Sequence, residues 1–409
     1  MKPLRIFLLA ALILVVFGMD NVEASKEPEW SYAADYYVNS VAISADGKYI
    51  VAGSEDRNLY FFDKDSSTPL WNYETGYAVD SVDISSDGKY IVAGSKDNRV
   101  YLFDKDGFLW NYTTDDEVES VAISADGKYI VVGSEDHKVY LFGKDSSTPL
   151  WYYTTEGDVD SVDISADGEY IAASYDAYGE GMIYLFNKDN NTPLWNYTTV
   201  SKDQNNNGGV QSVAISANGE YIVAGSEDHK VYLFDKDGFL WNYTTYSTVN
   251  SVDISADGEY LVAGGEDTKV YLFNKDSSAP LWSYNSVDLV QSVAISADGE
   301  YIVAISFGWF GSNQYLFDKD SSDPLWSYST RGTSMDISAD GEYIVSGDRF
   351  FVSLFDKTPS RGGGGGDGQG STQITEDNDD DEDDESLLPS ISLISSIAAI
   401  GIIALRRRY

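Results

Sequence analysis

The chain has 409 residues, no cysteine and a formal net charge of −40. This charge excludes nucleic acid as a partner, because binding to a phosphate backbone requires clustered lysine and arginine. The lack of cysteine excludes disulfides, thiolate nucleophiles and cysteine metal sites, so stability must come from burial. The 31 tyrosines, the 36 glycines and the short runs of β-branched residues are typical of an all-β chain with many tight turns.

The N-terminus has the pattern of a secretory signal peptide over residues 1–24. Lys2 and Arg5 precede an apolar run over residues 6–17, and Val22-Glu23-Ala24 resembles a small-residue cleavage site. We expect the mature chain to begin near Ser25. An uncleaved N-terminal anchor is the alternative, although the apolar run is short for a bilayer about 30 Å thick.

A unit of about 40 residues recurs along the next part of the chain. Each unit predicts four short strands: in residues 120–154 they are Ser-Val-Ala-Ile-Ser, Tyr-Ile-Val-Val-Gly-Ser, Val-Tyr-Leu-Phe and Pro-Leu-Trp-Tyr-Tyr, joined by Asp-Gly and Glu-Asp turns. Four strands at this period are the signature of a propeller blade. The first strands begin at Ser40, Ser81, Ser120, Ser161, Ser212, Ser251, Ser292 and Ser334.

The ring should close through the N-terminal strand. The eighth unit ends after its third strand, at Phe355-Asp356, and therefore lacks the fourth strand with its tryptophan. Glu29-Trp30-Ser31-Tyr32 has the pattern of that missing strand and lies before the first complete unit. We therefore predict an all-β fold over residues 25–357: an eight-bladed β-propeller of four-stranded antiparallel blades, in which the N-terminal strand completes the last blade and leaves no open sheet edge.

These repeats resemble two known propeller families over residues 29–357. The first three strands, as in residues 120–136, resemble WD repeats, and Asp237-Gly-Phe-Leu-Trp241 resembles the tryptophan repeat of quinoprotein (pyrroloquinoline-quinone)-like propellers. The third-strand tryptophan of WD repeats is replaced by phenylalanine in every unit, and the Gly-His pair is missing. The resemblance therefore implies apolar packing between blades in place of the hydrogen-bonded tetrad of that family, and it leaves the function open, since such propellers host enzymes, scaffolds and receptors.

The C-terminal part predicts a stalk and an anchor. Residues 358–386 contain five consecutive glycines and an acidic run over residues 376–385, which predicts a disordered spacer. A calcium-binding or partner-docking tail is the alternative for the acidic run. Residues 387–405 are apolar and long enough to span a bilayer, and the following Arg406, Arg407 and Arg408 predict a cytoplasmic tail over residues 406–409. This end resembles the C-terminal anchoring tails of archaeal surface proteins, so we expect an exported propeller anchored outside the membrane.

The residue types that catalysis needs are scarce. The two histidines, His137 and His229, occupy the same tight turn in two different units, so they are copies of a repeat position and not a converging pair. A quinone-dependent dehydrogenase would normally add cofactor-binding loops and often a vicinal disulfide, and neither is present. We therefore expect no catalytic residue, no enzyme activity and no cofactor, with calcium as the one ion that the sequence leaves open.

Breaks in the repetition indicate where a ligand could bind, because regular positions serve packing and inserted loops serve recognition. The breaks lie at residues 175–181, 200–209 and 307–313, and all three fall on the face that carries the connections after the second and fourth strands. Aromatic side chains among glycines suit stacking against a sugar ring or a peptide side chain. The predicted ligand-binding residues are Tyr175, Tyr178, Phe307, Trp309 and Phe310; the alternative is that these aromatics fold down over the central channel.

The third residue of the first strand alternates around the whole ring between alanine and aspartate. It is alanine at Ala42, Ala122, Ala214 and Ala294 and aspartate at Asp83, Asp163, Asp253 and Asp336. Because first strands surround the axis, the four carboxylates are candidate ligands of a cation such as calcium. The alternative is that each aspartate accepts hydrogen bonds from a neighbouring blade while alanine leaves room for it.

These patterns together predict a cell-surface binding or scaffolding propeller that contacts an extracellular protein or glycan and catalyses nothing. A quinoprotein-like or hydrolytic extracellular enzyme is the first alternative. A structural coat or adhesion protein that uses calcium is the second.

Overall fold

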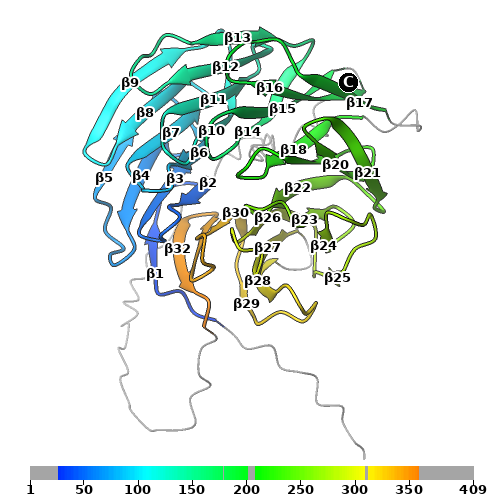
Figure 1. Cartoon of the computed structure of the whole chain (residues 1–409). Helices are drawn as coiled ribbons and strands as arrows, with labels where there is room; N and C mark the ends of the chain where they lie inside the picture. Colours follow the sequence, from blue (N-terminus) through cyan, green and yellow to red (C-terminus); the bar gives the residue numbers. More distant parts are fainter. Residues whose placement is uncertain (1–25, 178, 201–207, 309–311, 359–409) are drawn as a thin grey trace, which may run out of the picture.

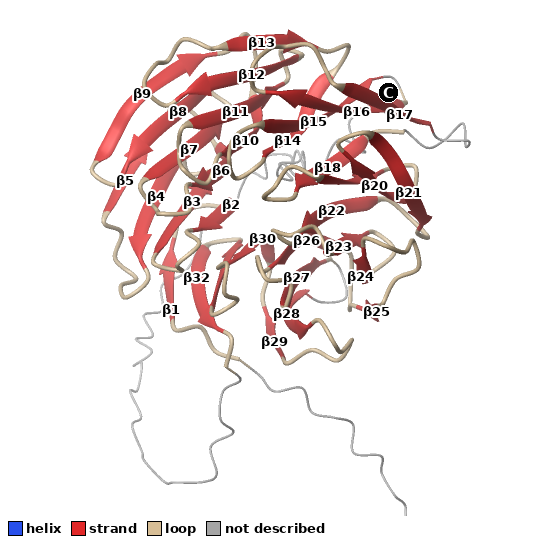
Figure 2. Cartoon of the chain, in the orientation of Figure 1, coloured by secondary structure: helices blue, strands red, loops and turns tan. Residues whose placement is uncertain are grey.

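The computed structural model describes residues 26–177, 179–200, 208–308 and 312–358. These residues form 32 strands arranged in eight separate four-stranded antiparallel sheets. Strands, turns and loops make up the whole of the described chain, without a helix (Figure 2). The sheets stand around a common axis like the blades of a propeller (Figure 1).

Blades one to seven each consist of four consecutive strands, and blade eight combines the two ends of the described chain. The strands of blades one to four are β2 (Val38–Ile43), β3 (Tyr49–Ser54), β4 (Asn58–Asp63), β5 (Trp71–Glu74); β6 (Val79–Ile84), β7 (Tyr90–Ser95), β8 (Arg99–Asp104), β9 (Gly107–Thr113); β10 (Val118–Ile123), β11 (Tyr129–Ser134), β12 (Lys138–Gly143), β13 (Trp151–Thr154); and β14 (Asp158–Ile164), β15 (Tyr170–Ala177), β16 (Glu180–Asn187), β17 (Trp195–Val200). Those of blades five to eight are β18 (Val210–Ile215), β19 (Tyr221–Ser226), β20 (Lys230–Asp235), β21 (Gly238–Thr244); β22 (Val249–Ile254), β23 (Tyr260–Gly265), β24 (Lys269–Asn274), β25 (Trp282–Asn285); β26 (Val290–Ile295), β27 (Tyr301–Phe307), β28 (Ser312–Asp318), β29 (Trp326–Ser329); and β30 (Gly332–Ile337), β31 (Tyr343–Asp348), β32 (Phe351–Asp356), β1 (Trp30–Ala33).

The predicted ring closure is confirmed. β1 pairs antiparallel with β32, with Trp30 opposite Leu354, so that the sheet order of blade eight is β1-β32-β31-β30. Lys26, just before β1, lies with its Nζ atom 2.8 Å from Asp356 Oδ1 and 3.1 Å from Glu29 Oε1. The two described ends of the chain are therefore held together within blade eight, at a place here called the seam.

The two faces of the propeller carry different connections because the strands alternate in direction. The connections after second and fourth strands lie on one side, here called the loop face. The connections after first and third strands lie on the other, here called the terminal face. Both described ends leave from the terminal face, since β1 begins there and β32 ends there.

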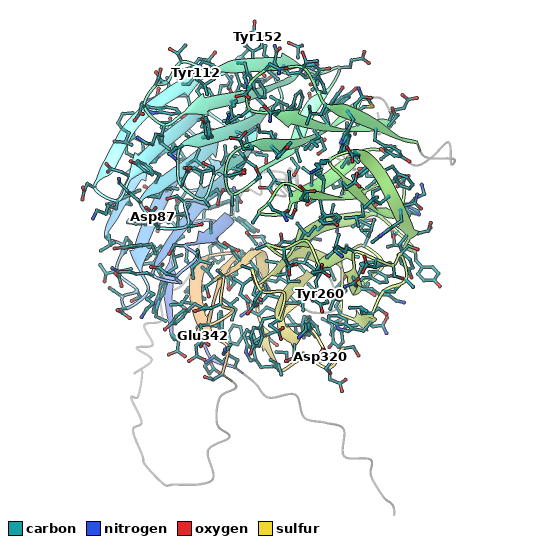
Figure 3. All side chains as sticks on the ribbon, in the orientation of Figure 1. Asp87, Tyr112, Tyr152, Tyr260, Asp320 and Glu342 are labelled. Atoms are coloured by element: carbon teal, nitrogen blue, oxygen red, sulfur yellow. The ribbon has the colours of Figure 1, made fainter. Side chains whose placement is uncertain are left out.

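The core lies between neighbouring blades, and each apolar cluster combines strands of two adjacent sheets. The third-strand phenylalanines that replace tryptophan are fully buried in these clusters, as the apolar packing expected from the sequence requires. They are Phe62, Phe103, Phe142, Phe186, Phe234, Phe273, Phe317 and Phe355. Side chains fill the space between the strands throughout the ring, and Tyr112 and Tyr152 mark its outer rim (Figure 3).

Close approach of the blades depends on a glycine near the end of the second strand. A Cβ atom on Gly94 would lie 2.6 Å from Cγ1 of Val118 in the next blade, closer than real carbon contacts allow. Between blades seven and eight the two residue types are exchanged: Ile305 stands at the glycine position and Gly332 at the valine position, where a Cβ would lie 1.8 Å from Ile305 Cδ1. The exchange nearly conserves the total volume at the blade interface, because isoleucine exceeds valine by a single methylene group, and such exchanges are tolerated best in a packed interior.

Fourth-strand tryptophans join the blades at their outer parts. The indole N–H of Trp110 donates a hydrogen bond to the carbonyl oxygen of Lys144 in the next blade, at 2.8 Å. The same bond, from 2.7 to 3.1 Å, is made by Trp30, Trp71, Trp151, Trp195, Trp241 and Trp282. Trp326, beside the seam, is fully buried and its indole N–H donates to none of the described residues.

The predicted targeting segments lie outside the described residues. These are the signal peptide over 1–24, the stalk over 358–386 apart from Thr358, the membrane helix over 387–405 and the tail over 406–409. Within the part of the chain that the structure describes, no helix is long and apolar enough to span a bilayer.

Candidate functional site

Two of the predicted breaks lie side by side on the loop face. β15 and β16 are each eight residues long, two more than the corresponding strands of blade three, so their hairpin extends beyond its neighbours. The end of the segment between blades four and five meets this hairpin, with Gly208 N donating to Gly179 O at 2.9 Å. The third break, in blade seven, begins at the half-buried Phe307. The glycine after it makes a close approach to Asp288, because a Cβ on Gly308 would lie 2.1 Å from Asp288 Oδ1 unless that carboxylate moved.

Of the five predicted aromatic residues the structure describes two, Tyr175 and Phe307, and neither is exposed. Tyr175 is buried, at 4% exposure, and its ring lies 5.8 Å from that of Tyr184 within blade four. This tyrosine is therefore a packing residue, because it replaces the small serine found at this position of blade three and fills the space between blades three and four. Tyr178, Trp309 and Phe310 lie outside the described residues, and their binding role stays a prediction.

An exposed aromatic group occurs instead on the loop face at the seam, formed by Tyr36, Tyr37, Arg349 and Phe350 and here called the seam patch. Tyr36 and Phe350 are 47% and 42% exposed. The Tyr37 ring lies 5.2 Å from that of Tyr36 and 6.0 Å from that of Phe350. The Arg349 guanidinium stacks 5.2 Å above the Tyr37 ring, and its Nε–H donates to the Tyr37 hydroxyl at 2.7 Å. The contacts hold a cation and three aromatic rings in one arrangement.

A search for insertions misses the seam patch, because the turn after the second strand is shortened in blade eight and not lengthened. Gly347 pairs with Val352, five positions later, whereas Gly133 of blade three pairs with Val139, six positions later, and the shorter turn contains Arg349 and Phe350. The two segments are also distant in sequence, and only ring closure brings Tyr37 next to Arg349. Two other loop-face tyrosines are exposed singly, Tyr77 at 59% and Tyr246 at 82%.

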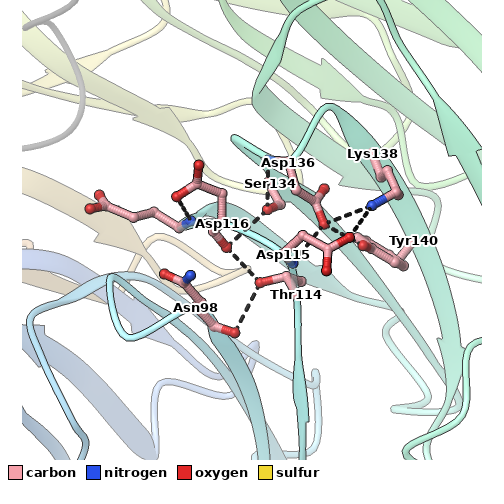
Figure 4. Close-up of polar contacts among 9 residues, drawn as sticks. Asn98, Thr114, Asp115, Asp116, Ser134, Asp136, Lys138 and Tyr140 are labelled. Atoms are coloured by element: carbon pink, nitrogen blue, oxygen red, sulfur yellow. Dashed lines mark hydrogen bonds and ion pairs between the residues drawn. The ribbon is translucent and has the colours of Figure 1, made fainter.

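The loops of this face are held by a repeated hydrogen-bond network, drawn for blade three in Figure 4. Thr114 Oγ1 lies 2.9 Å from Asn98 O and 2.6 Å from Asp116 O, which joins the incoming loop to the turn of blade two. Asp136 accepts hydrogen bonds from Asp115 N, at 3.0 Å, and from the Tyr140 hydroxyl. Burial, followed by the hydrogen bond to Asp136, raises the pKa of Tyr140, so the hydroxyl stays a donor. Exposed residues of these loops are therefore presented on a fixed backbone.

The four first-strand aspartates have a structural role that accounts for their alternation. Asp83 Oδ1 accepts a hydrogen bond from Ile84 N at 2.7 Å, and its Oδ2 accepts one from Ile123 N of the next blade at 2.8 Å. Asp163, Asp253 and Asp336 make the same pair of bonds with their own and the following blade, from 2.7 to 2.9 Å. Eight carboxylate oxygens thus satisfy eight inward N–H groups, so one aspartate is needed for every two blades.

This geometry favours the alternative left open by the sequence, in which each aspartate accepts hydrogen bonds that join neighbouring blades. It does not favour calcium binding at these aspartates. Every oxygen of Asp83, Asp163, Asp253 and Asp336 already accepts a backbone N–H. Among the described residues, the acidic side chains whose oxygens converge within 4.8 Å are others, namely Asp80, Glu117 and Glu119. Burial raises the pKa of Asp83 to about 8, that of Asp163 and Asp336 to about 7, and that of Asp253 to about 6.

The two histidines are turn residues, as expected. His137 and His229 occupy the same position of blades three and five with φ angles of 64° and 67°, in the left-handed region. His137 Nε2 lies 3.2 Å from Asp158 Oδ1 on the surface.

A cavity of about 400 Å³ lies on the terminal face at the seam. Charged side chains such as Glu29, Lys64, Glu342 and Asp356 line it, together with Trp30 and Tyr343. Asp356 and Glu29 are engaged there in closing the ring through Lys26. This cavity is on the face opposite the seam patch.

Comparison with known families agrees with the blade structure. The model of the WD domain, G-beta repeat, matches residues 27–63, 198–235 and 239–274. A model for a family of unknown function (DUF5711) matches residues 47–184. The first segment of the WD match joins β1 to blade one, and each match ends close to the end of a third strand. No curated protein matches the chain.

Proposed function

We propose that this WD40-repeat β-propeller is a non-catalytic binding or scaffolding protein of the cell surface, which contacts a protein or a glycan through its loop face. WD40 propellers are typical protein-binding scaffolds, although a fold alone does not define a function. The observation that carries the proposal is the seam patch, in which exposed Tyr36 and Phe350 flank a stacked Tyr37–Arg349 pair. Tyrosine and arginine are enriched among the residues that dominate binding energies.

The arrangement of the chain suits this role. The repeated positions of the blades serve packing. A second-strand glycine contacts a valine of the next blade, a fourth-strand tryptophan donates a hydrogen bond to a carbonyl of the next blade, and a first-strand aspartate accepts hydrogen bonds from backbone amides. The departures from the repeat, including the seam patch and the β15–β16 hairpin, concentrate on the loop face. A rigid scaffold that presents variable loops on one side is the usual arrangement of a recognition module.

The proposed location follows from the two ends of the sequence. Residues 1–24 would direct export and residues 387–405 would anchor the protein, with the propeller outside the cell. Both described ends leave from the terminal face, so the loop face would point away from the membrane. N-terminal sequencing of the mature protein, together with protease treatment of intact cells, tests this part: the proposal requires a start near Ser25 and cleavage of the propeller from outside.

The binding proposal is tested with the full-length chain in detergent, screened against a glycan array and a peptide display library. The double variant Tyr36→Ser/Phe350→Ser should weaken each selected interaction by about 30-fold or more, because a hot-spot side chain contributes about 2 kcal/mol or more. A matched control is Leu70→Ser/Phe108→Ser, which removes two side chains of similar exposure, 53% and 44%, near the terminal face; Leu70 lies just before β5 and Phe108 lies in β9. Equal loss of binding in both variants, or no loss in the first, would contradict a role for the seam patch.

A further inference from the structure

The fourth strand is the outermost strand of every blade, so one of its two edges has no partner strand. In blade two the sheet order is β6-β7-β8-β9, and β9, with Tyr112, lies at the rim of the ring (Figure 3). Its side chains alternate between half-buried Trp110 and Tyr112 and exposed Asn111 and Thr113. An unpaired edge offers backbone N–H and C=O groups to other chains and favours edge-to-edge association. The rim of the propeller therefore carries eight such edges.

Three of these outer strands carry the sequence Asn-Tyr-Thr. It occurs at residues 111–113 of β9 in blade two, at 196–198 of β17 in blade four and at 242–244 of β21 in blade five. The asparagine and the threonine of each motif are exposed, and the tyrosine between them is half-buried. Because side chains two positions apart point to the same side of a strand, each carboxamide and the following hydroxyl lie on one exposed face. Asn-x-Ser/Thr is the acceptor sequence for N-linked glycosylation.

The asparagine side chains of these motifs are not used by the fold. At the same position of β5 in blade one, Asn72 is followed by Glu74 in place of threonine, and its Nδ2 donates to Asn58 Oδ1 at 3.2 Å. Three other blades have serine at this position and one has tyrosine, so packing of the blade does not require asparagine. Within the described residues, no side-chain hydrogen bond is made by the asparagines of the three motifs, Asn111, Asn196 and Asn242. Each of these carboxamides therefore faces solvent with its nitrogen free.

A fourth acceptor sequence, Asn190-Asn191-Thr192, lies in the turn before β17. Here Asn190 Oδ1 accepts a hydrogen bond from Thr192 N at 2.9 Å, and Asn191 Nδ2 donates to Tyr152 O at 2.9 Å. A proline follows the threonine directly. These asparagines serve their own turn, whereas the asparagines of the three strand motifs have no such role.

We propose that Asn111, Asn196 and Asn242 are N-glycosylated, and that the three glycans cover the open strand edges of blades two, four and five. The inference rests on the proposed function, because it requires export of the propeller. A glycan is bulky and hydrophilic, and an exposed side chain at the rim accommodates it without displacing its neighbours. The seam patch lies at blades eight and one, so glycans on these three blades leave it open to a partner.

The modification joins the asparagine amide to a sugar that is carried on a polyisoprenoid phosphate or diphosphate. A bond forms between Asn Nδ2 and C1 of the sugar, and the bond between C1 and the phosphate oxygen breaks. The lipid phosphate leaves with the electron pair of that bond, and Nδ2 loses one proton. An oligosaccharyltransferase outside the cytoplasm would catalyse the transfer, which changes no oxidation state.

The test is peptide mass spectrometry of the full-length protein, purified in detergent from its natural host. An added mass of sugar residues is expected on three peptides, those with Asn111, Asn196 and Asn242. The peptide with Asn72 should keep its sequence mass. Thr113→Ala should abolish the added mass at Asn111 although the asparagine stays in place, and Thr113→Ser should keep it. Glu74→Thr completes the motif after Asn72 and should create a new modified site there.

The location of the protein is measured on the same cells, through its N-terminal residue and its cleavage by external protease. A chain that begins near Ser25 and is cleaved from outside, but has no glycan at any of the three asparagines, would overturn this inference and leave the proposed location standing. A chain that keeps residues 1–24 and is protected inside the cell would overturn both. Equal modification of Asn72 in the wild type would also overturn the inference, because exposure alone would then direct the addition.

The protective role is measured by size-exclusion chromatography of the exported protein in detergent. The triple variant Asn111→Gln/Asn196→Gln/Asn242→Gln should form larger assemblies than the wild type at the same concentration, because its strand edges are uncovered. Asn72→Gln, which changes the same position in a blade without the motif, should elute as the wild type does. If the triple variant also eluted as a species of the wild-type size, less the mass of its glycans, the glycans would have no role in covering the edges.

Discussion

Replacing Asp83 with alanine tests the role of the first-strand aspartates most directly. The substitution removes the acceptors of Ile84 N, at 2.7 Å, and of Ile123 N, at 2.8 Å, and so breaks a bond within blade two and a bond between blades two and three. An amide left without an acceptor costs about 1–3 kcal/mol. Because Asp83 is only partly buried, we expect the lower part of the summed range, a loss of about 2–4 kcal/mol in the free energy of unfolding.

The assay is urea unfolding of the full-length chain in detergent, followed by tryptophan fluorescence. Asp106→Ala is the control, because this aspartate is exposed in a turn of the same blade, and it should change stability by less than about 0.5 kcal/mol. The reverse exchange, Ala42→Asp, should also destabilise the protein. Ile43 N already donates to Asp336, so the added carboxylate finds no free amide from which to accept a hydrogen bond. If Asp83→Ala had the same free energy of unfolding as the control, the explanation of the alanine–aspartate alternation by hydrogen bonds to two backbone amides would be refuted.

Three further predictions follow from the same contacts. Burial raises the pKa values of the first-strand aspartates, to about 8 for Asp83 and about 6 for Asp253, so the folded state binds more protons than the unfolded state. The free energy of unfolding should therefore fall as the pH rises from about 4 to about 8, and it should fall less steeply in Asp83→Asn. Urea titrations at several pH values will measure both slopes. Although burial acts in the opposite direction, hydrogen bonds from Lys26 and Thr358 lower the pKa of Asp356. Lys26→Met should therefore reduce the free energy of unfolding by about 1 kcal/mol at pH 7, and this difference from the wild type should vanish as the pH falls below about 4. An unchanged difference in acid would show that Lys26 acts through packing alone. Gly94→Ala should cost about 1–3 kcal/mol in the same assay, because the new Cβ would lie 2.6 Å from a valine methyl group of blade three, and a second substitution that shortens this valine should restore part of the loss.

The architecture of this protein was determined by the sequence alone. The period, the four strands per unit and the displaced fourth strand at Trp30 together predict eight closed blades, and the structure has them. This part was predictable because each blade is a local unit whose strands follow one another in the chain. Closure was predictable because the count of tryptophan strands left one partner at the N-terminus.

The candidate site was decided only by the tertiary structure. The alternation of alanine and aspartate is visible in the sequence, but the two bonds of each aspartate depend on the distance between blades, which no local pattern gives. Tyr175 is an aromatic residue at a break in the repetition, which predicts a binding residue. It is nevertheless buried, because its ring fits the space between blades three and four. The seam patch combines residues from the two ends of the described chain, so it exists only once the ring has closed.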